Sequence, residues 1–124
     1  MKRVLILGGG FGGIATARRL KQRLDEKDEV ILVDRRDYFM VGFRKTWALT
    51  GQSTLEAGQR ALDSLTSLGS RVMRDAVTRI DPAARTAWMG DQRISADALV
   101  VALGAELAPE NIPGFQEYAY NVYD

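Results

Sequence analysis

Three glycines and one aspartate have the spacing of a site for phosphates and a ribose. The apolar run 4–7 leads directly into Gly8-x-Gly10-x-x-Gly13, and 21 residues after Gly13 a second apolar run ends in Asp34. Such a loop opens backbone N–H groups to a pyrophosphate, and a carboxylate that ends the second strand can accept hydrogen bonds from ribose hydroxyls. The spacing therefore predicts that the chain binds a dinucleotide.

Each glycine has its own predicted task in this loop. Gly8 lets the chain turn sharply out of the strand, Gly10 leaves no Cβ between the backbone and the phosphates, and Gly13 lets the next helix lie close to the sheet. The positive dipole end of that helix then faces the anion, so the phosphates need no basic side chain. For Asp34 two other interpretations stay open, a solvated loop carboxylate or a helix N-cap.

A helix and a second strand position these residues. We predict a helix from Phe11 to Leu24, because small or apolar residues recur at a spacing of three or four and would bury one face. Those residues are Ile14, Ala17, Leu20 and Leu24. A polar return loop at 25–28 leads to the strand 30–33, which is too apolar for a sheet that water reaches on either face. We therefore expect a parallel sheet that is covered on both sides.

The rest of the chain predicts one more helix and several strands. Residues 35–51 have no single period and are expected to be irregular or a short helix. A second helix should begin at the capping-box sequence 53–56, end at Gly69 and lie across the sheet. It would turn Leu55, Leu62, Leu65 and Leu68 inward. A short strand and an antiparallel meander should follow, at 71–73, 76–81, 86–89 and 92–95. The apolar run 98–105, with its strand near 98–102, resembles another central strand of the parallel sheet.

Composition restricts the classes of function. The 124 residues are 46% hydrophobic with a net charge of +1, which suits one core, so we expect a single domain at 1–124. The charge balance gives no electrostatic footprint for nucleic acid, and no apolar run approaches the roughly 20 residues of a spanning helix. Cysteine and histidine are absent, which excludes disulfides, thiolate or zinc sites and Ser-His-Asp catalysis. We expect a cytoplasmic chain without a metal site or a cleavable signal.

The order of these elements resembles the two-dinucleotide-domain flavoproteins of the glutathione-reductase type. Within that superfamily the segments 98–107, 112–115 and 121–124 are most similar to sulfide:quinone oxidoreductase and flavocytochrome c sulfide dehydrogenase, followed by type II NADH dehydrogenase. The family has an Ala-Thr-Gly motif where this chain has Ala102-Leu103-Gly104. The resemblance implies an α/β, three-layer FAD/NAD(P)-binding Rossmann-like fold, with helices on one face of a parallel sheet and the β-meander on the other.

The resemblance also implies FAD as the cofactor and assigns residues to it. The implied cofactor-binding residues are Gly8, Gly10, Phe11, Gly12, Gly13, Asp34, Arg35, Val77, Ala102 and Gly104. The glycine loop would hold the pyrophosphate, Asp34 the adenosine ribose and Arg35 the surroundings of the adenine. The backbone of Val77 would contact the adenine, while Ala102 and Gly104 would pass the middle of the cofactor. The side chains of Val77 and Ala102 fit an ordinary sheet core equally well.

The implied function is that of the N-terminal, FAD-binding part of a longer oxidoreductase. Such an enzyme would pass electrons from sulfide or NAD(P)H to a quinone-like acceptor, possess no catalytic residue within these 124 positions, and be inactive as an isolated piece. The family would place Tyr38–Thr46 near the flavin ring, although a packed connection explains that stretch as well. Two alternatives remain: a non-catalytic nucleotide-binding or sensor module, and a small NAD-dependent Rossmann dehydrogenase.

The last predicted strand, near 98–102, suggests how the chain could contact a second copy of itself. In the resembled fold a returning strand flanks it, so here the apolar edge 99–103 would be unpaired and prone to pair with a second copy. We therefore expect self-association as a homodimer. A tail at 106–124, with Tyr118, Tyr120 and Tyr123, would instead give a monomer if it covered the exposed surface. The longer relative could also be peripheral to a membrane.

Overall fold

The computed structural model describes residues 1–121 of the chain. They form two compact units, one of Met1–Phe39 with Arg60–Gly104 and one of Met40–Gln59 with the segment that begins at Ala105. Each unit is described by itself below. Val122–Asp124, which include Tyr123 and the end of the motif at 121–124, lie outside the described residues. The expectation of a single dinucleotide-binding domain stays a prediction.

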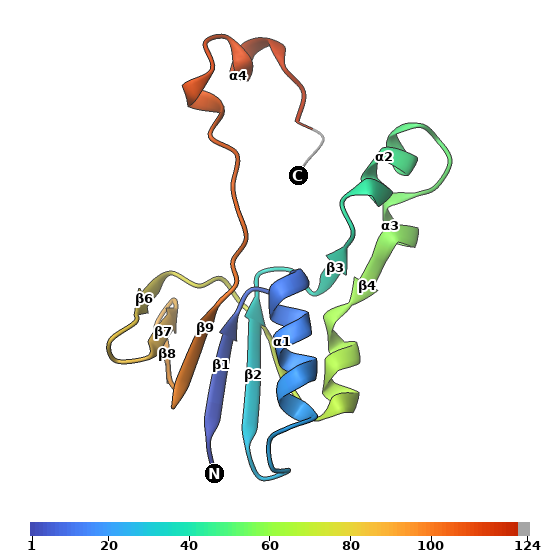
Figure 1. Ribbon diagram of the computed structural model, residues 1–124. Coiled ribbons are helices and arrows are strands. Elements are labelled where there is room, and N and C mark those ends of the chain that lie inside the picture. Colours follow the sequence, from blue (N-terminus) through green and yellow to red (C-terminus); the bar gives the residue numbers. More distant parts are fainter. Residues whose placement is uncertain (122–124) are drawn as a thin grey trace. The chain divides into compact units, whose positions relative to one another are not determined.

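The first unit is built on a four-stranded parallel sheet. Its strands are β1 (Arg3–Leu7), β2 (Glu29–Asp34), β5 (Arg71–Arg74) and β9 (Ala98–Val101). They lie in the order β5-β2-β1-β9, with Val4 opposite Val30 on one side and Ala98 on the other. Figure 1 shows β9, β1 and β2 side by side. The four predicted strands are confirmed, but the expectation of a central strand at the run 98–105 was wrong within residues 1–121. There β9 is an edge strand that ends at Val101.

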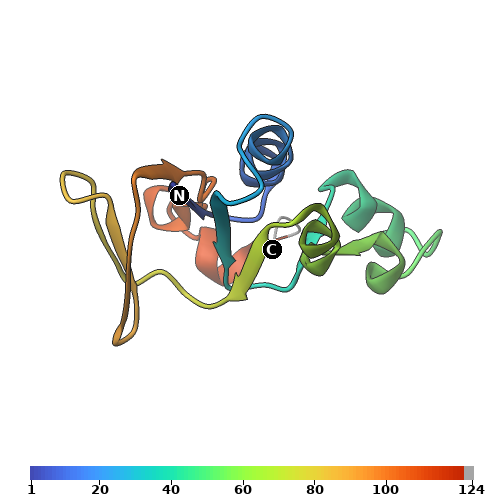
Figure 2. The same ribbon diagram turned by 90° about the horizontal axis from the view of Figure 1, so that it is seen from below.

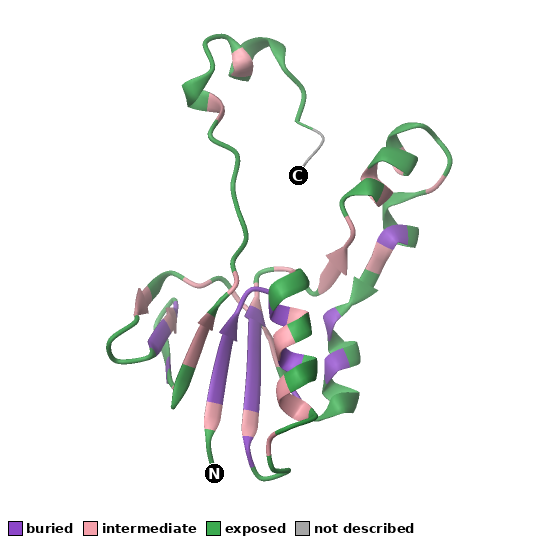
Figure 3. Cartoon of the chain, viewed as in Figure 1, coloured by how far each residue is buried: buried purple, intermediate pink, exposed green. Residues whose placement is uncertain are grey.

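Two layers cover the sheet because alternate residues of β1 and β2 point to opposite faces. Val4 and Ile6 pack with α1 (Phe11–Lys21) and the 3-10 helix η1 (Leu62–Leu68). Leu5 and Leu7 pack with the meander of β6 (Arg79–Asp81), β7 (Thr86–Met89) and β8 (Gln92–Ser95). Figure 2 shows α1 and the meander on different sides, and Figure 3 shows the burial concentrated in β1 and β2. The predicted three-layer α/β fold is confirmed.

The predicted helix over residues 53–69 was wrong. The chain forms a one-turn helix α3 (Leu55–Gly58), a strand β4 (Gln59–Ala61) that pairs with β3 (Tyr38–Met40), and then η1. The Thr54 side chain caps α3 by accepting a hydrogen bond from the Ala57 N–H at 3.3 Å. Because β4 interrupts the helical period, only two of the four leucines are buried. Leu62 and Leu65 are buried, whereas Leu55 and Leu68 are exposed.

Helix boundaries differ from the sequence prediction in smaller ways. Helix α1 ends at Lys21 rather than Leu24, although the Leu24 N–H still donates to the Leu20 carbonyl at 2.8 Å. Gly69 ends η1 with a φ of +83°, as its predicted role as a helix stop requires.

The second unit contains short elements with little buried surface. Its helices are α2 (Phe43–Leu49), α3, the 3-10 turn η2 (Pro109–Asn111) and α4 (Phe115–Tyr118). The predicted short helix at 35–51 is confirmed as α2. Tyr118 and Tyr120 are 83% and 96% exposed. Among the helices of residues 1–121, none has the length and apolar character needed to cross a membrane.

Candidate functional site

The glycine loop joins the end of β1 to the start of α1, and two of its glycines are required by close backbone packing. Gly8 has a φ of +105°, and a Cβ there would overlap the carbonyl oxygen of Ala102, which follows β9. A Cβ on Gly13 would overlap the carbonyl oxygen of Gly8. Both predicted roles are confirmed, the sharp turn at Gly8 and the close approach of helix to sheet at Gly13.

The outer side of the same loop is open. A Cβ on Gly10 would meet nothing within 4 Å, and one on Gly12 would make only an ordinary contact of 3.6 Å with the Ala102 Cβ. Gly10 is the N-cap of α1, with no side-chain cap, and the first intrahelical bond runs from the Ile14 N–H to the Gly10 carbonyl at 3.0 Å. The amides before Ile14 therefore have no partner within the helix. Free N–H groups at a helix N-terminus attract an anion.

Asp34 ends β2 beside this loop and is half-buried. Its Oδ2 accepts a hydrogen bond from the Gly9 N–H at 2.6 Å, and its Oδ1 accepts one from the Arg36 N–H at 2.7 Å. No helix starts at Asp34 within residues 1–121, so the N-cap interpretation is excluded. A carboxylate has about four acceptor positions, which leaves lone pairs for further donors.

Gly9 is a constrained residue that the sequence reasoning missed as part of the site. Its N–H is held by Asp34, and a Cβ there would lie 2.6 Å from Leu62 Cδ1 and 3.2 Å from Asp34 Cβ. The available signal was the run of three successive glycines, of which the predicted pattern uses only the outer two.

The other predicted residues differ in how close they lie to this loop. Ala102 is tied to β1 by its N–H, which donates to the Leu7 carbonyl at 2.8 Å. Phe11 is 68% exposed, and its ring stands edge-on to Phe39 with centroids 4.8 Å apart. Gly104, two residues beyond Ala102, has a φ of +79° and open space at its Cβ position. These residues lie at or follow the carboxyl ends of the strands.

The remaining two predicted residues follow β2 and β5. Arg35 comes directly after Asp34 and is exposed. Val77 lies in the connection from β5 to β6, and the N–H of Asp75 in that connection donates to the Asp34 carbonyl at 2.9 Å. The Val77 side chain packs against the core cluster on the meander face. This partly buried position fits the packing interpretation of the side chain, and the contact of the Val77 backbone with the adenine stays a prediction.

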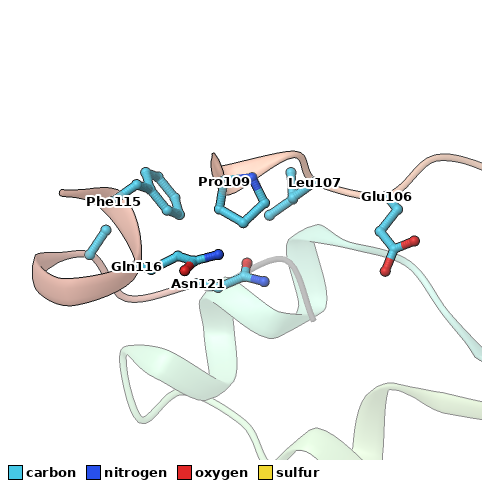
Figure 4. Close-up of a pocket in the computed structure, with 7 residues that line it drawn as sticks. Glu106, Leu107, Pro109, Phe115, Gln116 and Asn121 are labelled. Carbon is cyan, nitrogen blue, oxygen red and sulfur yellow. The ribbon is translucent and has the colours of Figure 1, made fainter. Parts of the chain in front are cut away.

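One pocket among the described residues belongs to the second unit. It has a volume of about 330 Å³ and contains none of the predicted site residues (Figure 4). Its lining is Glu106, Leu107, Pro109, Phe115, Gln116, Ala119 and Asn121. Over residues 1–121 there is also no cluster of acidic side chains that could hold a metal ion. The site with the clearest chemistry is thus the glycine loop with Asp34.

Known proteins place this arrangement in a family. Residues 2–124, almost the whole chain, match the family described as pyridine nucleotide-disulphide oxidoreductase. The chain belongs to this family. Its members are oxidoreductases, and the family resemblance inferred from the glycine loop, Asp34 and the late strand is confirmed.

Named relatives of this pyridine nucleotide-disulphide oxidoreductase chain include quinone reductases. Demethylphylloquinone reductase NdbB of Synechocystis is 34% identical over 94% of this chain and 31% of the reductase. The alternative NAD(P)H-ubiquinone oxidoreductase C1 of Arabidopsis thaliana is 34% identical over 98% of this chain and 27% of that protein. The sulfide:quinone oxidoreductase structure from Aquifex aeolicus superposes with a TM-score of 0.90 at 27% identity, over 100% of this chain and 29% of the other. The chain thus spans between 27% and 31% of the length of these relatives.

Proposed function

We propose that the chain binds FAD at the carboxyl end of its sheet. The observation that carries the proposal is the open backbone of the loop, where Gly10 has no neighbour at its Cβ position and precedes free N–H groups. The pyrophosphate would lie along Gly10–Gly13. Asp34, with lone pairs left over, would accept hydrogen bonds from the adenosine ribose.

The other implied residues would surround the rest of the cofactor. Phe11 and Gly8 belong to the pyrophosphate loop, Arg35 would lie near the adenine, and the backbone of Val77 would contact it. Ala102 and Gly104 would pass the middle of the cofactor, where the positive φ of Gly104 and the space beside it leave the backbone accessible. The resemblance would also place residues 38–46 near the flavin ring, and this placement stays a prediction.

For a whole protein of this family we propose electron transfer from NAD(P)H or sulfide to a quinone. The relatives support both donors, since one is an NAD(P)H-ubiquinone oxidoreductase and another a sulfide:quinone oxidoreductase. FAD, when bound, supplies the redox chemistry of such a reaction. The residues of this chain would bind and orient it, because the sequence contains no cysteine or histidine to act on a substrate. We expect a cytoplasmic protein, or one that is peripheral to a membrane.

Calorimetric titration of the 124-residue chain tests the choice of cofactor. FAD and ADP should bind more tightly than NADPH, because Asp34 would repel the 2′-phosphate of NADPH. Arg35 and Arg36 would offset part of that repulsion. Tighter binding of NADPH than of FAD or ADP would overturn the assignment.

A non-catalytic nucleotide sensor is the second candidate, favoured by the absence of a catalytic group in the sequence. Both candidates predict a mostly colourless preparation that holds the dinucleotide weakly and turns nothing over. A stoichiometric yellow preparation that reduces a quinone with NADH or sulfide would contradict both and indicate a minimal enzyme. Binding of NAD in preference to FAD would favour the simple NAD-dependent dehydrogenase instead.

We also propose that strand β9 is a contact between two copies of the chain. It is an edge strand, and Val101 and Leu103 near its end are 56% and 54% exposed. Sedimentation at micromolar concentration should detect self-association. A clean monomer, with hydrogen exchange at 99–103 that accelerates only when residues 106–124 are deleted, would contradict the dimer and indicate that the tail covers the edge.

A further inference from the structure

The carboxylate of Asp34 holds the glycine loop as well as facing the proposed ribose position. Its Oδ2 holds the N–H of Gly9 at 2.6 Å, across 25 positions of sequence. One residue earlier, the N–H of Gly8 donates to the Val33 carbonyl at 2.8 Å. The end of β2 therefore forms hydrogen bonds to two successive amides of the loop. The Val33 carbonyl binds the Gly8 amide, and the Asp34 side chain binds the Gly9 amide.

We propose that Asp34 is a positioning residue for the pyrophosphate end of the site, in addition to its contact with the ribose. This inference rests on the proposed nucleotide binding. Glycines lose more conformational freedom on ordering than any other residue, so a loop that is ordered beforehand binds its ligand more tightly. The Asp34 carboxylate supplies that order, because a hydrogen bond to a charged acceptor is stronger than one between neutral groups.

The surroundings of Gly9 support this role. Leu62 from η1 also packs against Gly9, where a Cβ would lie 2.6 Å from Leu62 Cδ1. With its N–H held by Asp34 and its Cα against Leu62, Gly9 is fixed and is withdrawn from the phosphate donors. The donors left for the pyrophosphate are the amides that follow Gly9, up to the first helical bond from Ile14.

The two roles of Asp34 predict opposite results for a ligand that has no ribose hydroxyls. If Asp34 only contacts the ribose, removing its negative charge relieves repulsion of the phosphates, so such a ligand binds equally well or better. If Asp34 also positions the loop, the same ligand binds more weakly without it. The probe is 2′,3′-dideoxy-ADP, which keeps the adenine and the diphosphate.

The experiment compares Asp34→Ala with Asp37→Ala by calorimetry, using ADP and 2′,3′-dideoxy-ADP. Asp37 is a matched control, because it carries the same charge three residues away but pairs with Arg74 at 3.2 Å rather than with the loop. We expect Asp34→Ala to weaken dideoxy-ADP binding by about tenfold or more, and Asp37→Ala to change it little. Asp34→Asn, which preserves the shape and can keep one of the two bonds, should give an intermediate loss in a variant that folds.

Three outcomes distinguish failure of the positioning role of Asp34 from failure of the proposed nucleotide binding. A wild type that binds neither ligand contradicts the proposed function itself. A wild type that binds both, with Asp34→Ala and Asp34→Asn equal to it or tighter for dideoxy-ADP, overturns the positioning role alone. A wild type that binds ADP but shows no measurable affinity for dideoxy-ADP also overturns the positioning role, because the affinity would then come from the ribose contact.

Hydrogen exchange at Gly9 gives a readout that does not involve a ligand. In the unliganded wild type the Gly9 amide should exchange slowly, and Asp34→Ala should accelerate it while Asp37→Ala leaves it unchanged. Equal exchange at Gly9 in all three proteins would contradict the positioning role.

Discussion

The two ends of the same parallel sheet are built from different chemistry. At the amino end, charged side chains form ion pairs with one another and accept hydrogen bonds from the first backbone amides of the strands. The Lys2 N–H donates to Asp28 Oδ1 and the Arg3 N–H to Asp97 Oδ2, both at 2.7 Å, while Arg3 Nε lies 2.6 Å from Glu29 Oε2. At the carboxyl end, the chain has glycines instead of charged side chains. The Asp34 carboxylate lies beside the backbone amides of the glycine loop.

The difference indicates that the amino end of the sheet contributes to stability and the carboxyl end to ligand binding. The amino end has its charges paired internally, so it offers little to a ligand and ties β1, β2 and the start of β9 together. Within residues 1–121, the N–H groups at the start of α1 have no intrahelical partner, and such groups need an anion or water. Changes at the amino end should therefore alter stability alone, and changes on the open side of the loop should alter binding alone.

Gly13→Ala should have the largest effect, because it tests the closed side of the loop. The new Cβ would overlap the carbonyl oxygen of Gly8, which is backbone and has no rotamer to change. We expect the free energy of unfolding to fall by about 3 kcal/mol or more, measured by urea denaturation. Gly12→Ala is the matched control and should cause no loss, since its Cβ would meet only an ordinary contact. Equal stabilities for the two variants would refute the closely packed geometry of the loop.

Gly10→Ala should separate binding from stability. The added methyl has nothing within 4 Å, so the free energy of unfolding should change by less than about 0.5 kcal/mol. The methyl would, however, stand where the phosphates approach the backbone, and ADP affinity should fall about tenfold by calorimetry. Unchanged ADP affinity in a folded Gly10→Ala protein would mean that the phosphates do not bind along this side.

Glu29→Gln should show the complementary behaviour at the amino end. It removes the charge that pairs with Arg3 at 2.6 Å and with Arg71 at 3.7 Å, and these side chains are partly exposed. The expected loss of unfolding free energy is about 1 kcal/mol, reduced by salt. ADP affinity should not change, and a drop in affinity would contradict the separation between the two ends.

Asp28→Asn should have the smallest effect, which would be a weaker dependence of the unfolding free energy on pH. The hydrogen bond from the Lys2 N–H lowers the pKa of Asp28 below its ordinary value, against the opposing effect of burial. A pKa that is lowered in the folded state contributes stability above the unfolded pKa, and this contribution disappears as pH falls through the folded pKa. Between pH 7 and about pH 2, the wild type should therefore lose more unfolding free energy than Asp28→Asn. Identical pH profiles for the two proteins would argue against the contribution.

The sequence predicted the parts of this site that depend on local geometry. Gly8 and Gly13 have fixed positions relative to the strand that precedes them, so their spacing was sufficient to predict the sharp turn and the close packing. The position of Asp34 beside the loop also follows from its spacing, and its contact with the ribose stays a prediction. The pattern did not include Gly9, because its constraints come from Asp34 and Leu62, two residues distant in sequence.

The same limit explains the errors in the fold. The leucine spacing suggested one helix, but the pairing of β4 with β3 divided it. Likewise, the apolar composition of β9 resembles that of a central strand, and its place at the edge was expected only from the resemblance, because it depends on which strands lie beside it. Long-range contacts decide both cases, and no local pattern encodes them.

An ADP titration followed by amide NMR tests the central claim most directly, since both ends of the sheet are observed in one experiment. The account predicts saturable shifts at the amides of Gly10–Gly13, with the amides of Arg3, Glu29 and Asp97 unmoved. Saturable shifts confined to the amino end, or no saturable shift in the glycine loop at millimolar ADP, would contradict the claim that the carboxyl end is the nucleotide site.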